Sequence, residues 1–174
     1  MATTKQADRL EERFRLWDRN GNDVIERADF EREAEDIIGR LNAEGTPAAA
    51  ELRRAYLGMF DHLAGAAGTD RMDRDQFLRV AEQEIISRGD AGFAAVVQPT
   101  IQAMVNVLDR DGDGEVSPEE MSLWLAAIGL EGDVADRAFR ELDTDGSGKL
   151  SVGELVDAVR DYHLGRNEIP LLGR

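Results

Sequence analysis

Two twelve-residue segments near the C-terminus carry oxygen-bearing side chains at the same alternating positions. The segments, residues 109–120 (DRDGDGEVSPEE) and 143–154 (DTDGSGKLSVGE), align without a gap. In both, positions 1, 3, 5, 9 and 12 are Asp, Ser or Glu, and position 6 is Gly. Ca²⁺ takes six to eight oxygen ligands, and a loop of this length supplies them from positions 1, 3, 5, 7, 9 and 12. The spacing therefore predicts one calcium site in each segment.

The predicted ligands are side-chain oxygens, except at position 7, where the backbone carbonyl serves. In residues 109–120, which we call the third loop, they are Asp109, Asp111, Asp113, Glu115 through its carbonyl, Ser117 through a water, and Glu120. In residues 143–154, the fourth loop, they are Asp143, Asp145, Ser147, Lys149 through its carbonyl, Ser151 and Glu154. Gly114 and Gly148 allow the sharp turn at position 6. Val116 and Leu150, at position 8, are predicted to pair as short strands.

The end of each loop also fits a purely structural role. Ser117 with Glu120, and Ser151 with Glu154, have the spacing of capping boxes, and Pro118 suits a first helical position. The two interpretations are compatible. A capping box accounts for only two residues of each loop, however, and leaves the remaining carboxylates repelling one another. Metal binding explains the full pattern.

A third copy of the pattern, residues 18–29, departs from the others at two positions; we call it the first loop. Position 6 is Asp23 instead of Gly, which costs about 1 kcal/mol in a left-handed conformation. Position 12 is Asp instead of Glu, so two-oxygen coordination requires a contracted loop. The alternatives are one-oxygen contact in a site that Mg²⁺ enters more readily, or an acidic helix start that binds no metal. The predicted ligands are Asp18, Asn20, Asn22, Val24 through its carbonyl, Glu26 and Asp29.

A fourth copy, the second loop, keeps the flanking apolar residues but lacks the ligands. With Leu63 as the last residue of the entering helix and Met72 at position 8, the loop spans residues 64–76 and contains an inserted residue. Its first half has no carboxylate, and Gln76 stands in the place of the closing Glu. We predict that this copy is structural and that Met72 pairs with Ile25.

Apolar residues at helical spacing precede and follow every loop, so the repeating unit is the helix–loop–helix of an EF-hand. The expected fold class is all-α, with four EF-hands in two apposed pairs and short β-bridges between paired loops. Connections near residues 42–47 and 88–92 are short. We expect a compact molecule with an N-terminal pair in residues 1–89 and a C-terminal pair plus tail in residues 90–174. Pro99 is predicted to kink or interrupt the helix that enters the third loop.

The sequence resembles the four-hand sarcoplasmic calcium-binding proteins, and among them the prokaryotic calerythrin type. The resemblance rests on a first loop that ends in Asp29, a silent second loop and two complete C-terminal loops. The tail VRDYHLGR at residues 159–166 adds weaker support, while Asp23 departs from the usual glycine. The resemblance implies a compact intracellular calcium buffer or transporter without enzymatic activity.

The excess of acidic residues disfavours negatively charged partners. Asp and Glu number 36 against 21 Lys and Arg, and the formal net charge of −15 repels nucleic acids and anionic lipid surfaces. The absence of cysteine excludes disulfides, thiolate zinc sites and cysteine nucleophiles. No apolar run is expected to reach the length of a membrane span, and neither Ala2 nor the terminal Leu-Leu-Gly-Arg signals lipidation. A monomeric cytoplasmic protein is expected, with no nucleic-acid or membrane partner.

Two other functional classes are weighed against a calcium buffer. An enzyme is disfavoured because His62 and His163 stand outside any nucleophile motif, and both are predicted to be surface residues. A calcium sensor, which opens an apolar groove to a target protein, remains the alternative. The chain has only 5 Met residues for an adaptable sensor surface, which favours a buffer. Trp17 and Trp124 lie on apolar stripes and are predicted to pack in the core.

The short closing residue of the first loop gives a prediction about ion selectivity. Replacement Asp29→Glu should tighten Ca²⁺ binding relative to Mg²⁺ binding at this loop, because the longer side chain reaches around the larger ion. Titration calorimetry with each ion, on both chains, measures the change in the ratio of affinities. Equal tightening for both ions would contradict the geometric explanation.

Overall fold

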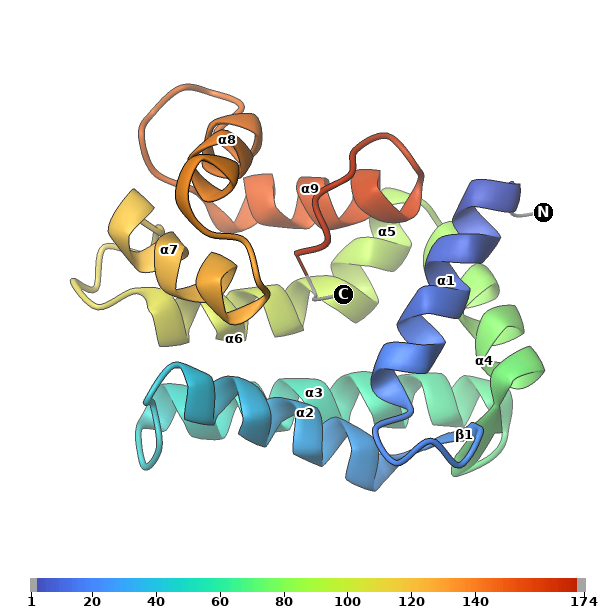
Figure 1. The fold of residues 1–174 in the computed structure, drawn as a ribbon. Coiled ribbons are helices and arrows are strands. Elements are labelled where there is room, and N and C mark those ends of the chain that lie inside the picture. Colours follow the sequence, from blue (N-terminus) through green and yellow to red (C-terminus); the bar gives the residue numbers. More distant parts are fainter. Residues whose placement is uncertain (1–2, 172–174) are drawn as a thin grey trace.

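The computed structural model, which describes residues 3–171, consists of helices arranged around four loops (Figure 1). The first hand contains α1 (Thr4–Trp17) and α2 (Arg27–Arg40), and the second contains α3 (Pro47–Ala67) and α4 (Arg74–Ala81). Two π-helical turns, η1 (Glu82–Ile86) and η2 (Phe93–Val97), flank the short α5 (Asp90–Gly92). The third hand contains α6 (Gln98–Leu108) and α7 (Pro118–Ala127), and the fourth contains α8 (Gly132–Leu142) and α9 (Val152–His163).

Short β contacts join the loops two by two, as predicted. Strands β1 (Val24–Glu26) and β2 (Arg71–Asp73) are antiparallel, with Ile25 opposite Met72. Val116 and Leu150 form a single bridge, in which their N–H groups donate to each other's carbonyl at 2.9 and 2.8 Å. All four of these side chains are fully buried. The hands are therefore paired first with second and third with fourth.

The second hand differs from the prediction at the end of its entering helix. Helix α3 continues through Ala67 and ends at Gly68, whose φ is +70°. The expectation that the helix ends at Leu63 and that an inserted residue lengthens the loop was wrong. Residues 64–67 include three alanines, the best helix formers, and Gly68 adopts the left-handed conformation that terminates a helix at low cost. The segment between α3 and β2 is consequently very short.

The helix that leads into the third loop changes from π-helical to α-helical geometry next to Pro99, and the kink or interruption expected there stays a prediction. The π-helical η2 ends at Val97, and α6 begins at Gln98 with Pro99 in its first turn, where its missing N–H is harmless. The whole stretch Asp90–Leu108 is long and apolar enough to cross a membrane by length and composition alone. The expectation that no stretch reaches that length was therefore wrong. More than half of this stretch is buried, and α6 packs against α3 and α9, which are the contacts of a core helix.

The two pairs of hands share one core. Helix α3 packs against both α2 and α6, and α1 packs against both α4 and α9, so each pair contributes helices to the same apolar interior. In Figure 1, α2 and α3 lie below α6, and α1 stands beside both layers. Trp17 and Trp124 are buried in this core, as predicted. The boundary expected at residues 89 and 90 falls at the turn before α5, and the division of the chain into two pairs at this point stays a prediction.

Residues 164–171 form a tail that folds back from the end of α9 toward α6 (Figure 1). The indole Nε1–H of Trp124 donates to the carbonyl of Leu171 at 2.8 Å, and Leu171 and Ile169 are buried in the core. Glu168 forms ion pairs with Lys5, at 2.6 Å, and with Arg9 on α1. The tail therefore connects the C-terminal hands to the first helix. The final residues of the chain, on which the lipidation expectation depends, lie outside the described residues.

His163 is buried, with only 7% of its surface exposed, so the prediction of a surface position was wrong for this histidine. It follows Val159 and Tyr162 at helical spacing on the inward face of α9, and its ring stacks near Phe93. Burial lowers the pKa of His163 to about 3, helped by the positive charges of Arg13 and Arg9. His62 lies on the surface, as predicted, where its Nε2 is 3.1 Å from a Glu84 carboxylate oxygen.

The buried histidine predicts a pH dependence of stability. The folded chain keeps His163 neutral, whereas the unfolded chain protonates it below about pH 6.5, so stability declines as the pH falls from 6.5 toward 3. The loss should reach about 1.4 kcal/mol per pH unit. Urea unfolding in chelator at pH 7, 6 and 5 should show a shallower slope for His163→Phe than for the unmodified chain. His62→Phe is the matched control and should keep the original slope; identical slopes in all three chains would contradict the explanation.

Candidate metal centre

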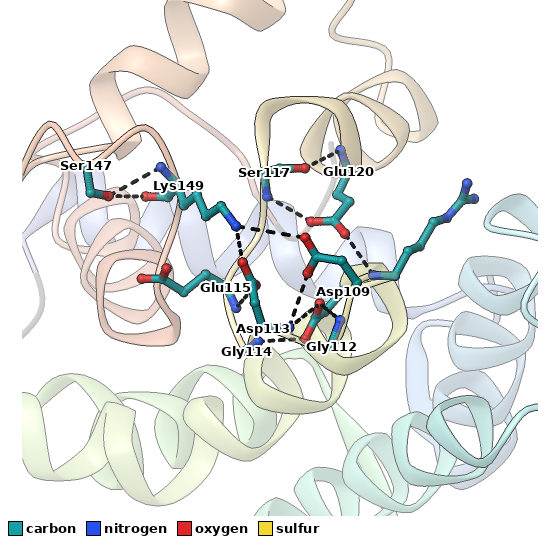
Figure 2. Close-up of polar contacts among 11 residues, drawn as sticks. Asp109, Gly112, Asp113, Gly114, Glu115, Ser117, Glu120, Ser147 and Lys149 are labelled. Atoms are coloured by element: carbon teal, nitrogen blue, oxygen red, sulfur yellow. Dashed lines mark hydrogen bonds and ion pairs between the residues drawn. The ribbon is translucent and has the colours of Figure 1, made fainter.

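The third loop gathers its carboxylates around one point (Figure 2). Oxygen atoms of Asp109, Asp111 and Glu120 all lie within 4.8 Å of one another. Asp109 accepts hydrogen bonds from the backbone N–H groups of Gly112, at 2.7 Å, and Gly114, at 2.8 Å. Gly114 has a φ of +82°, the left-handed conformation that position 6 requires. The loop backbone thus holds its first carboxylate in place while the other two face it.

Glu120 lies in the first turn of helix α7 and closes the third loop at the same time. One of its carboxylate oxygens accepts from the Ser117 N–H at 2.9 Å, and the other accepts from the Arg110 N–H at 2.8 Å. The Glu120 N–H in turn donates to the Ser117 hydroxyl, which completes the predicted capping box. The side chain therefore reaches from the last position of the loop back to the second. The two roles that the sequence suggested for this residue are combined in one conformation.

The fourth loop repeats these contacts. Oxygen atoms of Asp143, Asp145 and Glu154 lie within 4.8 Å of one another. Asp143 accepts from the Gly148 N–H at 2.9 Å, and Glu154 accepts from the Ser151 and Asp145 N–H groups at 2.9 and 3.3 Å. The Ser147 hydroxyl donates to the Lys149 carbonyl at 2.9 Å, which brings the oxygens of positions 5 and 7 together. Contacts within the fourth loop thus hold together the predicted ligand oxygens of positions 1, 3, 5, 7 and 12.

The first loop has the same backbone contacts but amide side chains at positions 3 and 5. Asp18 accepts from the Asp23 N–H at 2.9 Å, and Asp29 accepts from the Glu26 N–H at 2.9 Å. Asp23 has a φ of +64°, so position 6 adopts the left-handed conformation without glycine. Positions 3 and 5 are amides, and the Asn20 side chain donates to Asp29 at 3.4 Å. This loop therefore offers the carboxylates of Asp18, Glu26 and Asp29 together with two amide oxygens, whereas the third and fourth loops have Asp at position 3 and each gather three carboxylates within 4.8 Å.

The second loop lacks carboxylates in its first half and at its closing position but keeps the closing contact. The Gln76 amide oxygen accepts from the Asp73 N–H at 3.0 Å, and Asp73 accepts from the Gln76 N–H at 2.8 Å. A neutral side chain thus occupies the place of Glu120 and Glu154 and makes the same capping box. The contact orders the start of α4 without a carboxylate at the closing position of the loop. The geometry agrees with the predicted structural role of this hand.

Hydrogen bonding keeps key carboxylates of the third loop ionised. Burial acts to raise the pKa of Asp109, but the N–H groups of Gly114 and Gly112 outweigh it and hold the pKa below its usual value. The pKa of Glu120 is also lowered, because bonds from Ser117 and Arg110 outweigh the effect of burial. In the first loop, burial raises the pKa of Asp29, which is only 1% exposed. At neutral pH, Asp109 and Glu120 therefore present negative oxygens to a hard cation without prior loss of a proton.

Comparison with known proteins identifies the family. Models of the EF hand match residues 101–123 and 134–162, which contain the third and fourth loops. Calerythrin of Saccharopolyspora erythraea is 40% identical over 177 residues, an alignment that covers 99% of this chain and 100% of that protein. The chain belongs to the calerythrin family of EF-hand calcium-binding proteins. Proteins of this family bind calcium and are not enzymes, so the resemblance predicted from the loops is confirmed.

Other proteins are similar to this calerythrin-family chain in sequence or in fold. The luciferin-binding protein of Renilla reniformis is 29% identical and aligns over 94% of this chain and 88% of its own. A solved structure of a Streptomyces coelicolor calcium-binding protein is 30% identical, with a TM-score of 0.74 over 91% of this chain and 98% of that one. Calcium-loaded apo-aequorin from Aequorea victoria superposes with a TM-score of 0.75 at 20% identity, over 97% and 94% of the two chains. This last likeness concerns the fold alone.

In this calerythrin-family chain, Lys149 makes a contact that the spacing of the loop residues did not indicate. The Lys149 side chain leaves the fourth loop and forms an ion pair with Asp113 of the third loop (Figure 2). The pattern concerned only the carbonyl of this residue, because position 7 supplies a backbone oxygen. The one signal in the sequence is the difference between the two position-7 residues, Glu115 in the third loop and Lys149 in the fourth.

Proposed function

We propose that this chain is a calcium buffer or transporter with three cation sites, one each in the first, third and fourth loops. The observation that supports three sites is the contact pattern that these loops share. In each, the carboxylate at position 1 accepts from the N–H at position 6, and the carboxylate at position 12 accepts from the N–H at position 9. The proposed ligands are the same residues that the spacing of the first, third and fourth loops predicted.

The first site is proposed to admit Mg²⁺ more readily than the other two. Its closing residue, Asp29, is shorter than Glu, and its positions 3 and 5 are the neutral Asn20 and Asn22. The shorter reach of the closing residue favours a smaller ion that keeps part of its water shell. Mg²⁺ is therefore expected to compete with Ca²⁺ chiefly at this loop.

A buffer is favoured over a sensor because apolar surface is covered within the chain itself. Helices α3 and α6 pack the two pairs of hands against each other, and the tail places Ile169 and Leu171 in the core beside Trp124. A sensor requires an apolar groove that is open to a target. In this chain the tail and the opposite pair occupy such surface, so a target segment would have to displace them.

A sensor is the second candidate, supported by a relative. The Streptomyces coelicolor calcium-binding protein, 30% identical to this chain, has been described as acting in prokaryotic calcium-mediated regulation. Exposed apolar side chains on the C-terminal hands, Leu123 and Val134, are compatible with a contact surface. Displacement of the tail by a partner would convert the proposed buffer into a regulator.

The ligand assignment predicts the number of bound ions. Replacements Glu120→Gln and Glu154→Gln should each remove most calcium affinity from their own loop, because each deletes the charge and half of the two-oxygen contact at the closing position. Titration calorimetry should show three sites in the unmodified chain and one fewer in each variant. Gln76→Ala, in the second loop, is the matched control and should leave the stoichiometry at three. An unchanged stoichiometry and affinity in the Glu variants would overturn the assignment.

The buffer proposal predicts the response of a hydrophobic dye. Saturation with Ca²⁺ should reduce or leave unchanged the fluorescence of a dye that binds exposed apolar surface, because binding stabilises the closed arrangement. The measurement compares one preparation in chelator, in Mg²⁺ and in Ca²⁺. A sensor opens its helix pair and exposes a groove, so a large increase specific to Ca²⁺ would contradict the buffer and support the second candidate.

A further inference from the structure

Lys149 belongs to one loop by its backbone and contacts another by its side chain. Its carbonyl lies at position 7 of the fourth loop, where it accepts from the Ser147 hydroxyl. Its Nζ forms an ion pair with the Asp113 carboxylate and lies 3.9 Å from an oxygen of Asp111. Figure 2 shows the side chain crossing from the fourth loop to the third. The ammonium group is therefore held beside the two carboxylates at positions 3 and 5 of the neighbouring loop.

The pairing of the loops explains why the side chain reaches that far. The bridge between Val116 and Leu150 fixes the loops side by side, and Lys149 directly precedes Leu150. Its counterpart before Val116 is Glu115, which carries the opposite charge. The lysine thus stands where the bridge brings the fourth loop close to the acidic positions of the third. A neutral residue at this position would leave Asp111 and Asp113 without the cationic group.

We propose that the Lys149 ammonium group competes with the cation for the carboxylates of the third loop. It thereby lowers the calcium affinity of the third loop more than that of the fourth loop, to which Lys149 belongs. The proposal rests on the proposed function, because it takes Asp111 and Asp113 as ligands of a bound ion. An entering Ca²⁺ must break the ion pair, and the lysine then repels the bound ion across a short distance. The lysine also relieves repulsion between the carboxylates before binding, which reduces the gain from binding.

The exposure of the pair sets the size of the effect. The Lys149 side chain is 38% exposed and that of Asp113 is 32% exposed, so solvent screens the interaction and the lysine can turn outward when an ion binds. An exposed ion pair of this kind corresponds to a change in affinity of about two- to five-fold. Because the contact is screened by dissolved salt, the change should be smaller at high ionic strength. The fourth loop uses only the carbonyl of Lys149, so its affinity should depend less on the side chain.

The test isolates one loop at a time in the full-length chain. In a chain that carries Glu154→Gln, which silences the fourth loop, Lys149→Met should tighten calcium binding at the third loop by about two- to five-fold in calorimetry at low salt. Lys149→Arg keeps the charge and is the matched control, expected to show little tightening. Raising the salt concentration should reduce the difference between the Met and Lys chains.

A second background separates this proposal from the assignment of the sites. In a chain that carries Glu120→Gln, which silences the third loop, Lys149→Met should tighten calcium binding at the fourth loop by less than it does at the third, because the fourth loop uses only the carbonyl of this residue. No tightening at the third loop, or equal tightening at both loops, would overturn the proposed competition while the three sites stand. Failure of Glu120→Gln and Glu154→Gln to silence their loops would instead overturn the proposed function, and calorimetry of these two variants alone reveals it.

Discussion

The carboxylate at the end of each acidic loop accepts hydrogen bonds from the loop backbone, and its residue lies in the first turn of the following helix. Glu120 binds the N–H groups of Ser117 and Arg110, and Glu154 binds those of Ser151 and Asp145. Any ion held by these carboxylates is therefore linked directly to the start of α7 or α9. The second hand keeps the same contact through neutral Gln76, so it can order its helix without a cation. Helix placement and ion binding depend on one side chain per hand.

The pairing of the loops links the position of each helix start to the rest of the fold. Ile25 with Met72, and Val116 with Leu150, join the loops at fully buried positions. The hands then meet through α3 and α6, and through α1 and α9, where Arg9 lies 3.8 Å from the centre of the Tyr162 ring and the Tyr162 hydroxyl donates to Glu12 at 2.9 Å. A silent second hand is retained in this arrangement because it supplies half of the N-terminal pair and the long helix against which α6 packs.

The sequence predicted the features that depend on local spacing and missed those that depend on distant neighbours. The loops and their position-8 pairing follow from residue types at fixed offsets. The end of α3 was misplaced because an alanine-rich run reads either as loop or as helix, and the helix-terminating Gly68 decides between them. The burial of His163 depends on Phe93 and on α1, which no local pattern contains. The contact of Lys149 with Asp113 likewise exists only once the two loops are paired.

The most direct test of this account is thermal unfolding at a series of free calcium concentrations. Each Ca²⁺ adds two positive charges, so three ions would reduce the formal net charge of −15 to about −9 and relieve repulsion in the folded chain alone. A ligand at about one hundred times its dissociation constant stabilises by about 2.7 kcal/mol per site. The account predicts a melting temperature that rises steeply with calcium and falls again in chelator. A melting curve that is insensitive to both would contradict it.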